Sequence, residues 1–238
     1  MPDQPADHAA NLGPAAGATG TPDESGVVDV VVLAGGTGRR LGGAVKPDVV
    51  ARGTRLLDHV LAGLEQLRDR GLPLGHVCVV APAAVDLPTG VLRALEDPPL
   101  GGPVAGIAAG LESLDQCGPT AGLIGLLTCD APSSWRALPG LIEALRQSEP
   151  GADGVCALDG DHVQYLLGLY RRRALATAVA PDGVPLRDTA VRRSLGRLRV
   201  TAIHVPHGVS HGLGVVVRRL RRRAGDPHGS GQRRGRRP

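Results

Sequence analysis

Short apolar runs rich in β-branched residues alternate along this chain with stretches that have helical spacing. Such runs are typical of strands buried on both faces of a sheet. The alternation predicts an α/β fold, a three-layer Rossmann-like arrangement with a mostly parallel sheet and helices on both faces. The predicted strands are VVDVVVLA (27–34), HVCVVAP (76–82), AGLIGLLTCD (121–130), GVCAL (154–158), HVQYLLGLY (162–170) and RVTAIHVP (199–206).

The segments between these runs predict helices. In the first, 54–71, Thr54 is the expected N-cap and Gly71 the expected end. Pro103 lies near the start of a second, as proline does at the first turn of many helices. A helix capped by Ser133 or Ser134 is expected after the third strand run. The remaining predicted helices are 102–114, 133–147, 171–180 and 186–195, with 89–97 a short helix or turn.

Composition indicates a globular protein with an aliphatic core. Of the 238 residues 42% are hydrophobic, yet there is no Phe, one Trp and only two Tyr. The four cysteines form no CxxC pair, so neither a zinc site nor a disulfide framework is expected. No apolar run reaches membrane-spanning length, and the N-terminus lacks the pattern of a signal peptide. We therefore expect a soluble, cytoplasmic protein that does not associate with a membrane.

Charge and composition divide the chain into three parts. Residues 1–26, rich in Ala, Gly, Pro and Asp, predict a disordered leader, residues 27–206 a globular domain, and residues 207–238 a basic, disordered tail. Residues 218–238 hold nine arginines and one acid, which leaves 18 basic and 22 acidic side chains in 1–217. The basic character therefore belongs to the tail, and a nucleic-acid partner is not expected.

A glycine-rich loop follows the first predicted strand, in LAGGTGRRLGGAVKP (33–47). It contains Lys46, the only lysine in the chain. Backbone N–H groups of such a loop can wrap a phosphate. The loop is not a Walker A motif, since Pro47 follows the lysine, and its glycine spacing does not fit the dinucleotide fingerprint. A tight turn with solvated arginines is the alternative.

The whole string resembles the signature of the molybdenum cofactor guanylyltransferases, a family of MobA-like nucleotidyltransferases. EDPPLGGPVAGIAAGL (96–111) is similar to that family's acidic residue and G-P-[LV]-A-G segment. LLTCDAPSSW (126–135) is similar to its strand ending in D-x-P, and VQYLLGLYRRRAL (163–175) to its Q-P-L-x-x-x-Y-R segment. These ordered matches span about residues 30–175.

The resemblance implies a Mg²⁺-dependent enzyme that transfers GMP from GTP to the phosphate of molybdopterin, with release of pyrophosphate. It implies that Lys46 and Arg40 offset phosphate charge, and that Asp130, at the end of a buried strand, holds the metal and is catalytic. An N-cap or turn role is the alternative for Asp130. The expected nucleotide-binding residues are Leu33, Ala34, Gly35, Gly36, Thr37, Gly38, Lys46, Asp97 and Gly102.

Two departures from the family pattern leave alternatives open. Val45 precedes the lysine where relatives commonly have Asp, and an acidic C-terminal D-x-D-[TS]-W-x-D pattern is missing. Back-translation of 212–218, read one base later, permits DSESWSD, so a frameshifted C-terminus is an alternative to a genuine basic extension. The alternative functions are transfer from CTP or to another acceptor, a nucleotide-binding but inactive partner of molybdoenzyme maturation proteins, and a nucleic-acid binder acting through the arginine tail.

Overall fold

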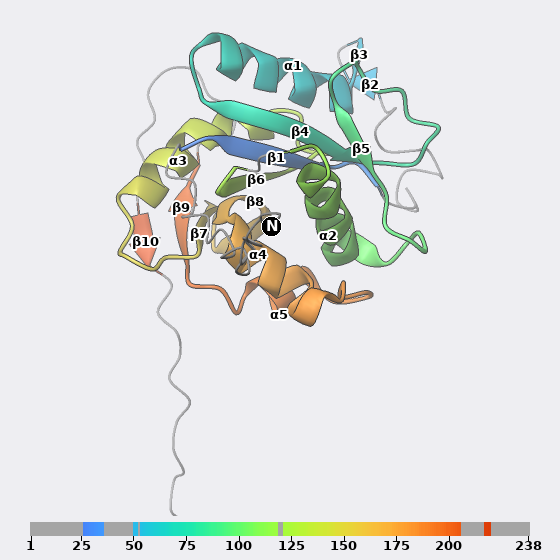
Figure 1. Cartoon of the computed structure of the whole chain (residues 1–238). Helices are drawn as coiled ribbons and strands as arrows, with labels where there is room; N and C mark the ends of the chain where they lie inside the picture. Colours follow the sequence, from blue (N-terminus) through green and yellow to red (C-terminus); the bar gives the residue numbers. More distant parts are fainter. Residues whose placement is uncertain (1–25, 36–49, 52, 119–120, 206–216, 220–238) are drawn as a thin grey trace, which may run out of the picture.

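The computed structural model describes residues 26–35, 50–51, 53–118, 121–205 and 217–219, and its centre is one eight-stranded sheet (Figure 1). The strands follow the order β10-β9-β7-β8-β6-β1-β4-β5. Six run parallel to one another, whereas β8 and β10 run the opposite way. The strands are β1 (Val28–Leu33), β4 (Leu74–Val80), β5 (Leu92–Ala94), β6 (Leu123–Thr128), β7 (Gly154–Asp159), β8 (His162–Arg171), β9 (Val200–His204) and β10 (Val217–Arg219).

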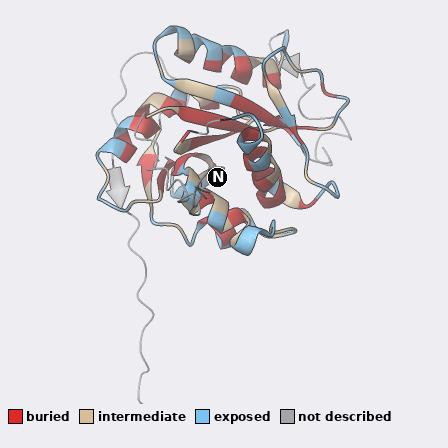
Figure 2. Cartoon of the chain, viewed as in Figure 1, coloured by how far each residue is buried: buried red, intermediate tan, exposed pale blue. Residues whose placement is uncertain are grey.

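Helices cover both faces of the sheet, which confirms the predicted three-layer α/β fold. On one face α1 (Leu56–Asp69) packs against β4, and α3 (Leu138–Arg146) packs against β7 and β8. On the other face lie α2 (Gly102–Asp115), α4 (Arg172–Val179) and α5 (Val191–Leu195). Two aliphatic cores result, one on each side of the sheet, and Figure 2 shows burial along the strands and the inward helix faces.

Several predicted element boundaries were wrong. Segment 89–97 contains the edge strand β5, which pairs in parallel with β4, where a helix or turn was expected. Thr54 is not the N-cap of α1, because it lies in the two-residue strand β3 (Thr54–Arg55) that pairs with β2 (Val50–Ala51). Arg55 takes the cap position, and its guanidinium contacts Asp58 in the first turn.

The later helices also differ from the prediction. Neither Ser133 nor Ser134 caps a helix through its side chain; a 3₁₀ turn, η3 (Ser134–Ala137), leads directly into α3. The helix expected over 186–195 is only α5, because Asp188 has a left-handed φ of 49° and Ala190 is extended. A second 3₁₀ turn, η4 (Pro181–Gly183), follows α4.

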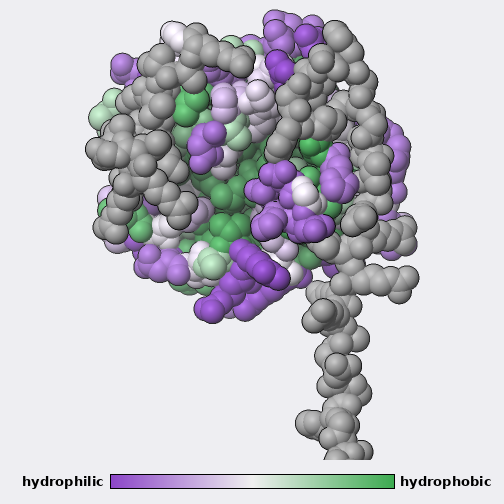
Figure 3. All heavy atoms as spheres, turned by 180° about the vertical axis from the view of Figure 1, so that it is seen from behind, coloured by the Kyte–Doolittle hydropathy of each residue, from purple (hydrophilic) through white to green (hydrophobic). Residues whose placement is uncertain are grey.

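The predicted leader and tail fall almost wholly outside the described residues. Of the tail, only residues 217–219 are described; they form β10, which pairs antiparallel with β9. Seen from behind, hydrophobic residues gather in the middle of one face, with hydrophilic residues around them (Figure 3). In the part of the chain that the structure describes, no helix is both long and apolar enough to cross a membrane.

Candidate functional site

The carboxyl ends of β1, β4, β5 and β6 meet at one edge of the sheet and are tied together by backbone hydrogen bonds. The N–H of Ala34 donates to the carbonyl of Val80 at 3.0 Å, and the N–H of Cys129 donates to the carbonyl of Leu33 at 3.1 Å. The N–H of Ala81 donates to the carbonyl of Ala94 at 2.9 Å. The chain therefore leaves four adjacent strands at the same place, which is where ligands bind in open α/β sheets.

The first part of the predicted nucleotide-binding loop starts at this edge. Leu33 is half-buried at the end of β1, Ala34 is buried and Gly35 is exposed. A Cβ on Gly35 would lie 3.7 Å from the Val80 carbonyl oxygen, an ordinary contact, so the described packing does not itself require glycine there. The remaining predicted residues of this loop lie outside the described residues: Gly36, Thr37, Gly38, Arg40 and Lys46.

The turn after β5, which contains Glu96 and Asp97, lies at the same carboxyl edge of the sheet. Glu96 is half-buried and accepts a hydrogen bond from the Leu100 N–H at 3.0 Å, whereas Asp97 is exposed. The Asp97–Pro98 peptide bond is cis, and Leu100 and Gly102 have left-handed φ values of 70° and 87°. Glu96 thus holds the turn while the Asp97 carboxylate faces solvent. For Gly102 the positive φ supplies a backbone reason for glycine.

The turn places the start of α2 at the strand ends. Its first turn carries no acidic residue, so the positive end of the helix dipole faces this edge uncompensated by its own side chains. The Asp188 N–H donates to the Gly101 carbonyl at 2.8 Å. A Cβ on Gly101 would come within 2.7 Å of the Arg187 guanidinium, so glycine lets the 187–188 segment pack against the turn.

Asp130 lies two residues after the end of β6 and is exposed in the turn that leads to η3. Two backbone bonds fix this turn, from the Ala131 N–H to the Thr128 carbonyl and from the Ser134 N–H to the Ala131 carbonyl. The Ser134 hydroxyl is buried in the same turn with no hydrogen-bond partner among the described residues. Among the described residues no three His, Cys, Asp or Glu side chains cluster as a metal site, so a cation here would have few protein ligands.

A pocket of about 560 Å³ adjoins this turn, between it and α1. The Trp135 ring lies directly against Gly63, where a Cβ would come within 2.3 Å of the ring atoms. The Arg136 guanidinium lies 5.1 Å from the centre of that ring. Sequence reasoning missed this pocket, although a lone tryptophan and a glycine in mid-helix were its visible signals. The polar residues that line it are Thr54, Asp58, His59, Gln66, Ser133 and Arg136.

The buried cysteines are unsuited to nucleophilic chemistry. Burial raises the pKa of Cys78 to about 11 and that of Cys156 to about 12. Cys129 is also buried, and only Cys117 of the four is exposed. Because the thiolate is the reactive form, Cys78 and Cys156 remain inert thiols at neutral pH, as expected of small buried hydrophobes.

Comparison with known proteins identifies the family. The model of the MobA-like NTP transferase domain matches residues 30–202, most of the chain. This chain belongs to the MobA-like NTP transferase family. The match confirms the resemblance seen in the motifs and makes the chain a nucleotidyltransferase by family.

One named relative agrees with this family, and two solved structures share the fold. A molybdenum cofactor guanylyltransferase of Aliivibrio salmonicida (strain LFI1238) is 28% identical over 147 residues, which are 61% of this chain and 69% of that protein. Rv0371c of Mycobacterium tuberculosis H37Rv has the same fold, with a TM-score of 0.54 at 20% identity over 75% of this chain and 88% of that one. So does 4-diphosphocytidyl-2C-methyl-D-erythritol synthase of Anaerococcus prevotii DSM 20548, with a TM-score of 0.52 at 11% identity over 76% and 90%.

Proposed function

We propose that this MobA-like protein transfers GMP from GTP to the phosphate of molybdopterin, forming the guanine dinucleotide and pyrophosphate. The observation that carries the proposal is the convergence of three family segments at one sheet edge. They are the start of the glycine loop at Leu33–Gly35, the turn at Asp97–Gly102, and Asp130. The name of the Aliivibrio salmonicida relative supports the substrates.

The proposed reaction needs positioning and charge stabilisation rather than a protein nucleophile. An oxygen of the molybdopterin phosphate attacks the α-phosphorus of GTP, and the bond from that phosphorus to the bridging oxygen of pyrophosphate breaks. Backbone N–H groups of the glycine loop hold the nucleotide. Arg40 and Lys46 offset the charge that develops on the departing pyrophosphate, in the way preorganised cations stabilise a transition state. Asp97 and Gly102, in the turn between β5 and α2, contribute to recognition of the nucleotide.

The exposed Asp130 carboxylate suits a magnesium ion. Mg²⁺ prefers oxygen ligands and usually takes one or two protein carboxylates plus phosphates and waters. Asp130 supplies one exposed carboxylate, and because no three potential protein ligands cluster among the described residues, phosphate and water oxygens would supply most of the other ligands. Bound there, Mg²⁺ would supply charge neutralisation for the triphosphate. A solved complex of Rv0371C with manganese, at a TM-score of 0.50 and 18% identity, supports a divalent cation.

Nucleotide choice is tested by thermal shift of the full chain with Mg²⁺ and either GTP or CTP. CTP is the comparison because a protein of the same fold is named a diphosphocytidyl synthase. The proposal predicts a rise in Tm with GTP and a clearly smaller one with CTP, because only a nucleotide that binds the native state stabilises it. Equal shifts would remove the guanine assignment and leave the nucleotidyltransferase assignment intact.

A further inference from the structure

A second pocket, of about 590 Å³, lies between α4 and the segment that leads from α5 to β9. Its size is in the range of small-molecule sites. The Ser194 hydroxyl donates to the Ala178 carbonyl at 2.6 Å and so fixes α5 against α4 at this place. The floor is apolar and the rim carries arginines; the residues that matter here are Arg171, Arg173, Ala174, Ala178, Leu186 and Leu198. We call it the α4–α5 pocket.

The α4–α5 pocket lies away from the strand ends that form the candidate site. Asp153, in its lining, precedes β7, and Leu198 precedes β9. Arg171 ends β8, which runs antiparallel to β6 and β7. All three therefore belong to the amino edge of the parallel strands, opposite Leu33 and Asp130. A ligand in this pocket would not occupy the nucleotide site.

The pocket carries excess positive charge. Of the described residues that line it, Asp153 alone is acidic. The Asp153 carboxylate already accepts hydrogen bonds from Arg199, at 2.7 Å from its backbone N–H and 3.3 Å from its guanidinium. The Arg171 Nε–H donates to the Ala152 carbonyl, a neutral acceptor, at 2.9 Å. Arg173 is exposed at the rim.

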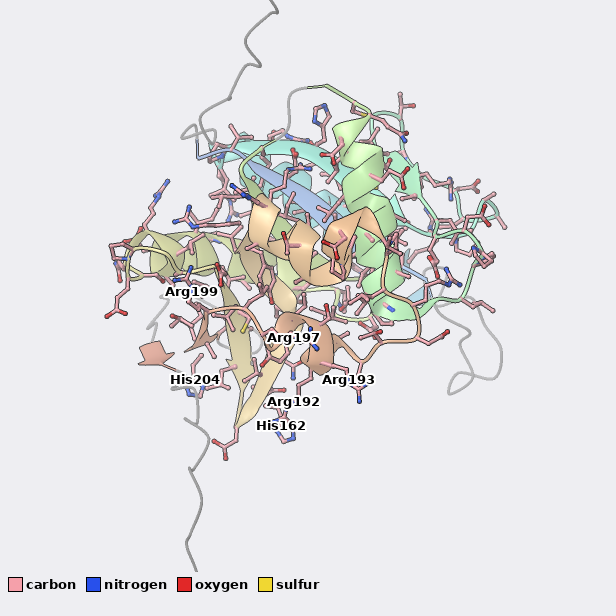
Figure 4. The ribbon with its side chains drawn as sticks, turned by 60° about the horizontal axis from the view of Figure 1, so that its bottom comes forward. His162, Arg192, Arg193, Arg197, Arg199 and His204 are labelled. Atoms are coloured by element: carbon pink, nitrogen blue, oxygen red, sulfur yellow. The ribbon has the colours of Figure 1, made fainter. Side chains whose placement is uncertain are left out.

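The part of the chain that forms most of this pocket is also rich in positive charge. Residues 171–205 contain eight arginines and two aspartates, whereas residues 1–170 contain 10 basic and 20 acidic side chains. A potential of one sign over a concave surface concentrates ligands of the opposite sign. Figure 4 shows Arg192, Arg193 and Arg197 beside one another on and just after α5, and Arg197 lines the pocket.

We propose that the α4–α5 pocket binds a small organic anion with an apolar body, such as an aromatic phosphate ester. Arg171 and Arg173 meet the anionic group, since a guanidinium binds phosphate or carboxylate through paired hydrogen bonds. Ala174, Ala178 and Leu186 contact the apolar body. This site is separate from the nucleotide site and independent of the proposed transferase reaction.

The test is isothermal titration of the full chain with 1-naphthyl phosphate, in the presence of saturating GTP and Mg²⁺. The account predicts one binding site that persists with GTP present. Inorganic phosphate, which lacks the apolar body, and 1-naphthalenemethanol, which lacks the charge, both bind at least about tenfold more weakly. Displacement of 1-naphthyl phosphate by GTP would overturn the proposal, as would equal binding of either partial ligand.

Variants assign the binding to the pocket. Arg173→Glu reverses a rim charge and Ala174→Phe fills the floor; each weakens binding about tenfold or more. Arg146→Glu makes the same charge change on α3, on the other face of the sheet, and leaves binding unchanged. A Tm near that of the wild type shows that each variant is folded. If the two pocket variants bind like the wild type, or if Arg146→Glu loses binding equally, the pocket is not the site.

Discussion

Glu96 and Asp97 are adjacent carboxylates that the structure gives different surroundings. Glu96 accepts the Leu100 N–H within its own turn, whereas Asp97 is exposed at the strand-end edge. The sequence alone left their register open, because two neighbouring acids before two prolines fit either role. The hydrogen bond separates them and favours Asp97 as the residue that meets the nucleotide.

Replacing Asp97 therefore tests this assignment. Asp97→Ala is expected to weaken GTP binding about tenfold or more, because it removes a charged hydrogen-bond acceptor from the proposed site. Glu96→Gln keeps an acceptor for the Leu100 N–H and is expected to retain GTP affinity within about twofold. Titration of both variants with GTP and Mg²⁺ measures this. The reverse order of effects would show that Glu96, not Asp97, contacts the nucleotide.

Because of the two buried thiols, Cys78 and Cys156, the free energy of unfolding is expected to depend on pH in the alkaline range. Unfolded cysteine ionises near pH 8.5, whereas burial raises the pKa of Cys78 to about 11 and that of Cys156 to about 12. Between these values the unfolded chain binds fewer protons than the native one. The free energy of unfolding therefore falls as pH rises, by up to about 1.4 kcal/mol per pH unit for each thiol.

Urea unfolding at about pH 8, 9 and 10 measures this slope. Cys156→Ala lowers stability at every pH because it leaves a small cavity, but its slope is expected to be shallower than that of the wild type. If the two slopes coincide, the Cys156 thiol does not titrate with folding.

At the scale of elements, the buried Asp29 carboxylate links β1 to β4, to the segment before β6 and to α4. Asp29 in β1 accepts hydrogen bonds from the His76 N–H of β4 at 2.8 Å and from the Ala121 N–H before β6 at 3.2 Å. Arg172, at the start of α4, donates to Asp29 and to Asp115 at the end of α2, each at 2.6 Å. This cluster fixes the amino edge of the sheet, where the sequence shows only one acid in an apolar run.

Asp29→Ala is expected to destabilise the protein by about 3–5 kcal/mol, because it leaves buried donors and the Arg172 charge without their acceptor. Glu65→Ala removes an exposed pair with Arg68 and is expected to cost under about 1 kcal/mol. Denaturant unfolding compares the two. Similar small losses in both variants would mean that the buried cluster contributes no more than a surface pair.

At Gly63, helix propensity favours alanine whereas the packing against Trp135 favours glycine. Alanine favours a helix over glycine by about 1 kcal/mol, but a Cβ here would lie 2.3 Å from the Trp135 ring. Overpacking of this kind costs about 1–3 kcal/mol, so Gly63→Ala is expected to be destabilising on balance and to shift the fluorescence of the only tryptophan. Its exposed neighbour provides the control, since Ala62→Gly should follow propensity alone and leave the emission spectrum unchanged. A stabilised Gly63→Ala protein would contradict the close packing.

The strands of the sheet were predictable from sequence more completely than the connections. Apolar runs of β-branched residues are a local signal, and each of the six predicted strands is present. The edge strand β5 was missed because it is three residues long and only one of them is buried. Its identity comes from pairing with β4, which local patterns do not encode.

Strand β8 also has a feature that local sequence patterns did not predict. Cys156 pairs with Gly168 and Ala157 with Gln164, so three residues of β8 bulge out of the ladder. The buried Tyr170 hydroxyl donates to the Tyr165 carbonyl at 2.6 Å and holds the bulge. The run 162–170 predicted a strand but contained no sign of this extra length, because the bulge depends on a contact between side chain and backbone five residues apart.

For the whole molecule, the fold explains how motifs distant in sequence come together. Parallel strands bring the ends of 27–34 and 121–130 to one edge, so the fold prediction was enough to group the start of the glycine loop with Asp130. Asp97 and Gly102 join them because β5, which the sequence did not predict, ends at the same edge. The pockets were not predictable, because each depends on how helices and turns pack against one another, which local sequence patterns do not encode. The catalytic roles of Arg40 and Lys46 stay predictions from the family motif.

The central claim is that this edge of the sheet performs nucleotidyl transfer. Its most direct test is pyrophosphate release by the full chain given GTP, molybdopterin and Mg²⁺, for the wild type, Lys46→Ala, Asp130→Ala and the exposed control Asp69→Ala at the end of α1. The account predicts turnover by the wild type and Asp69→Ala, and rates lowered about 100-fold or more in the other two variants. Full rates in both Lys46→Ala and Asp130→Ala would contradict it, as would a wild-type protein that binds GTP without releasing pyrophosphate.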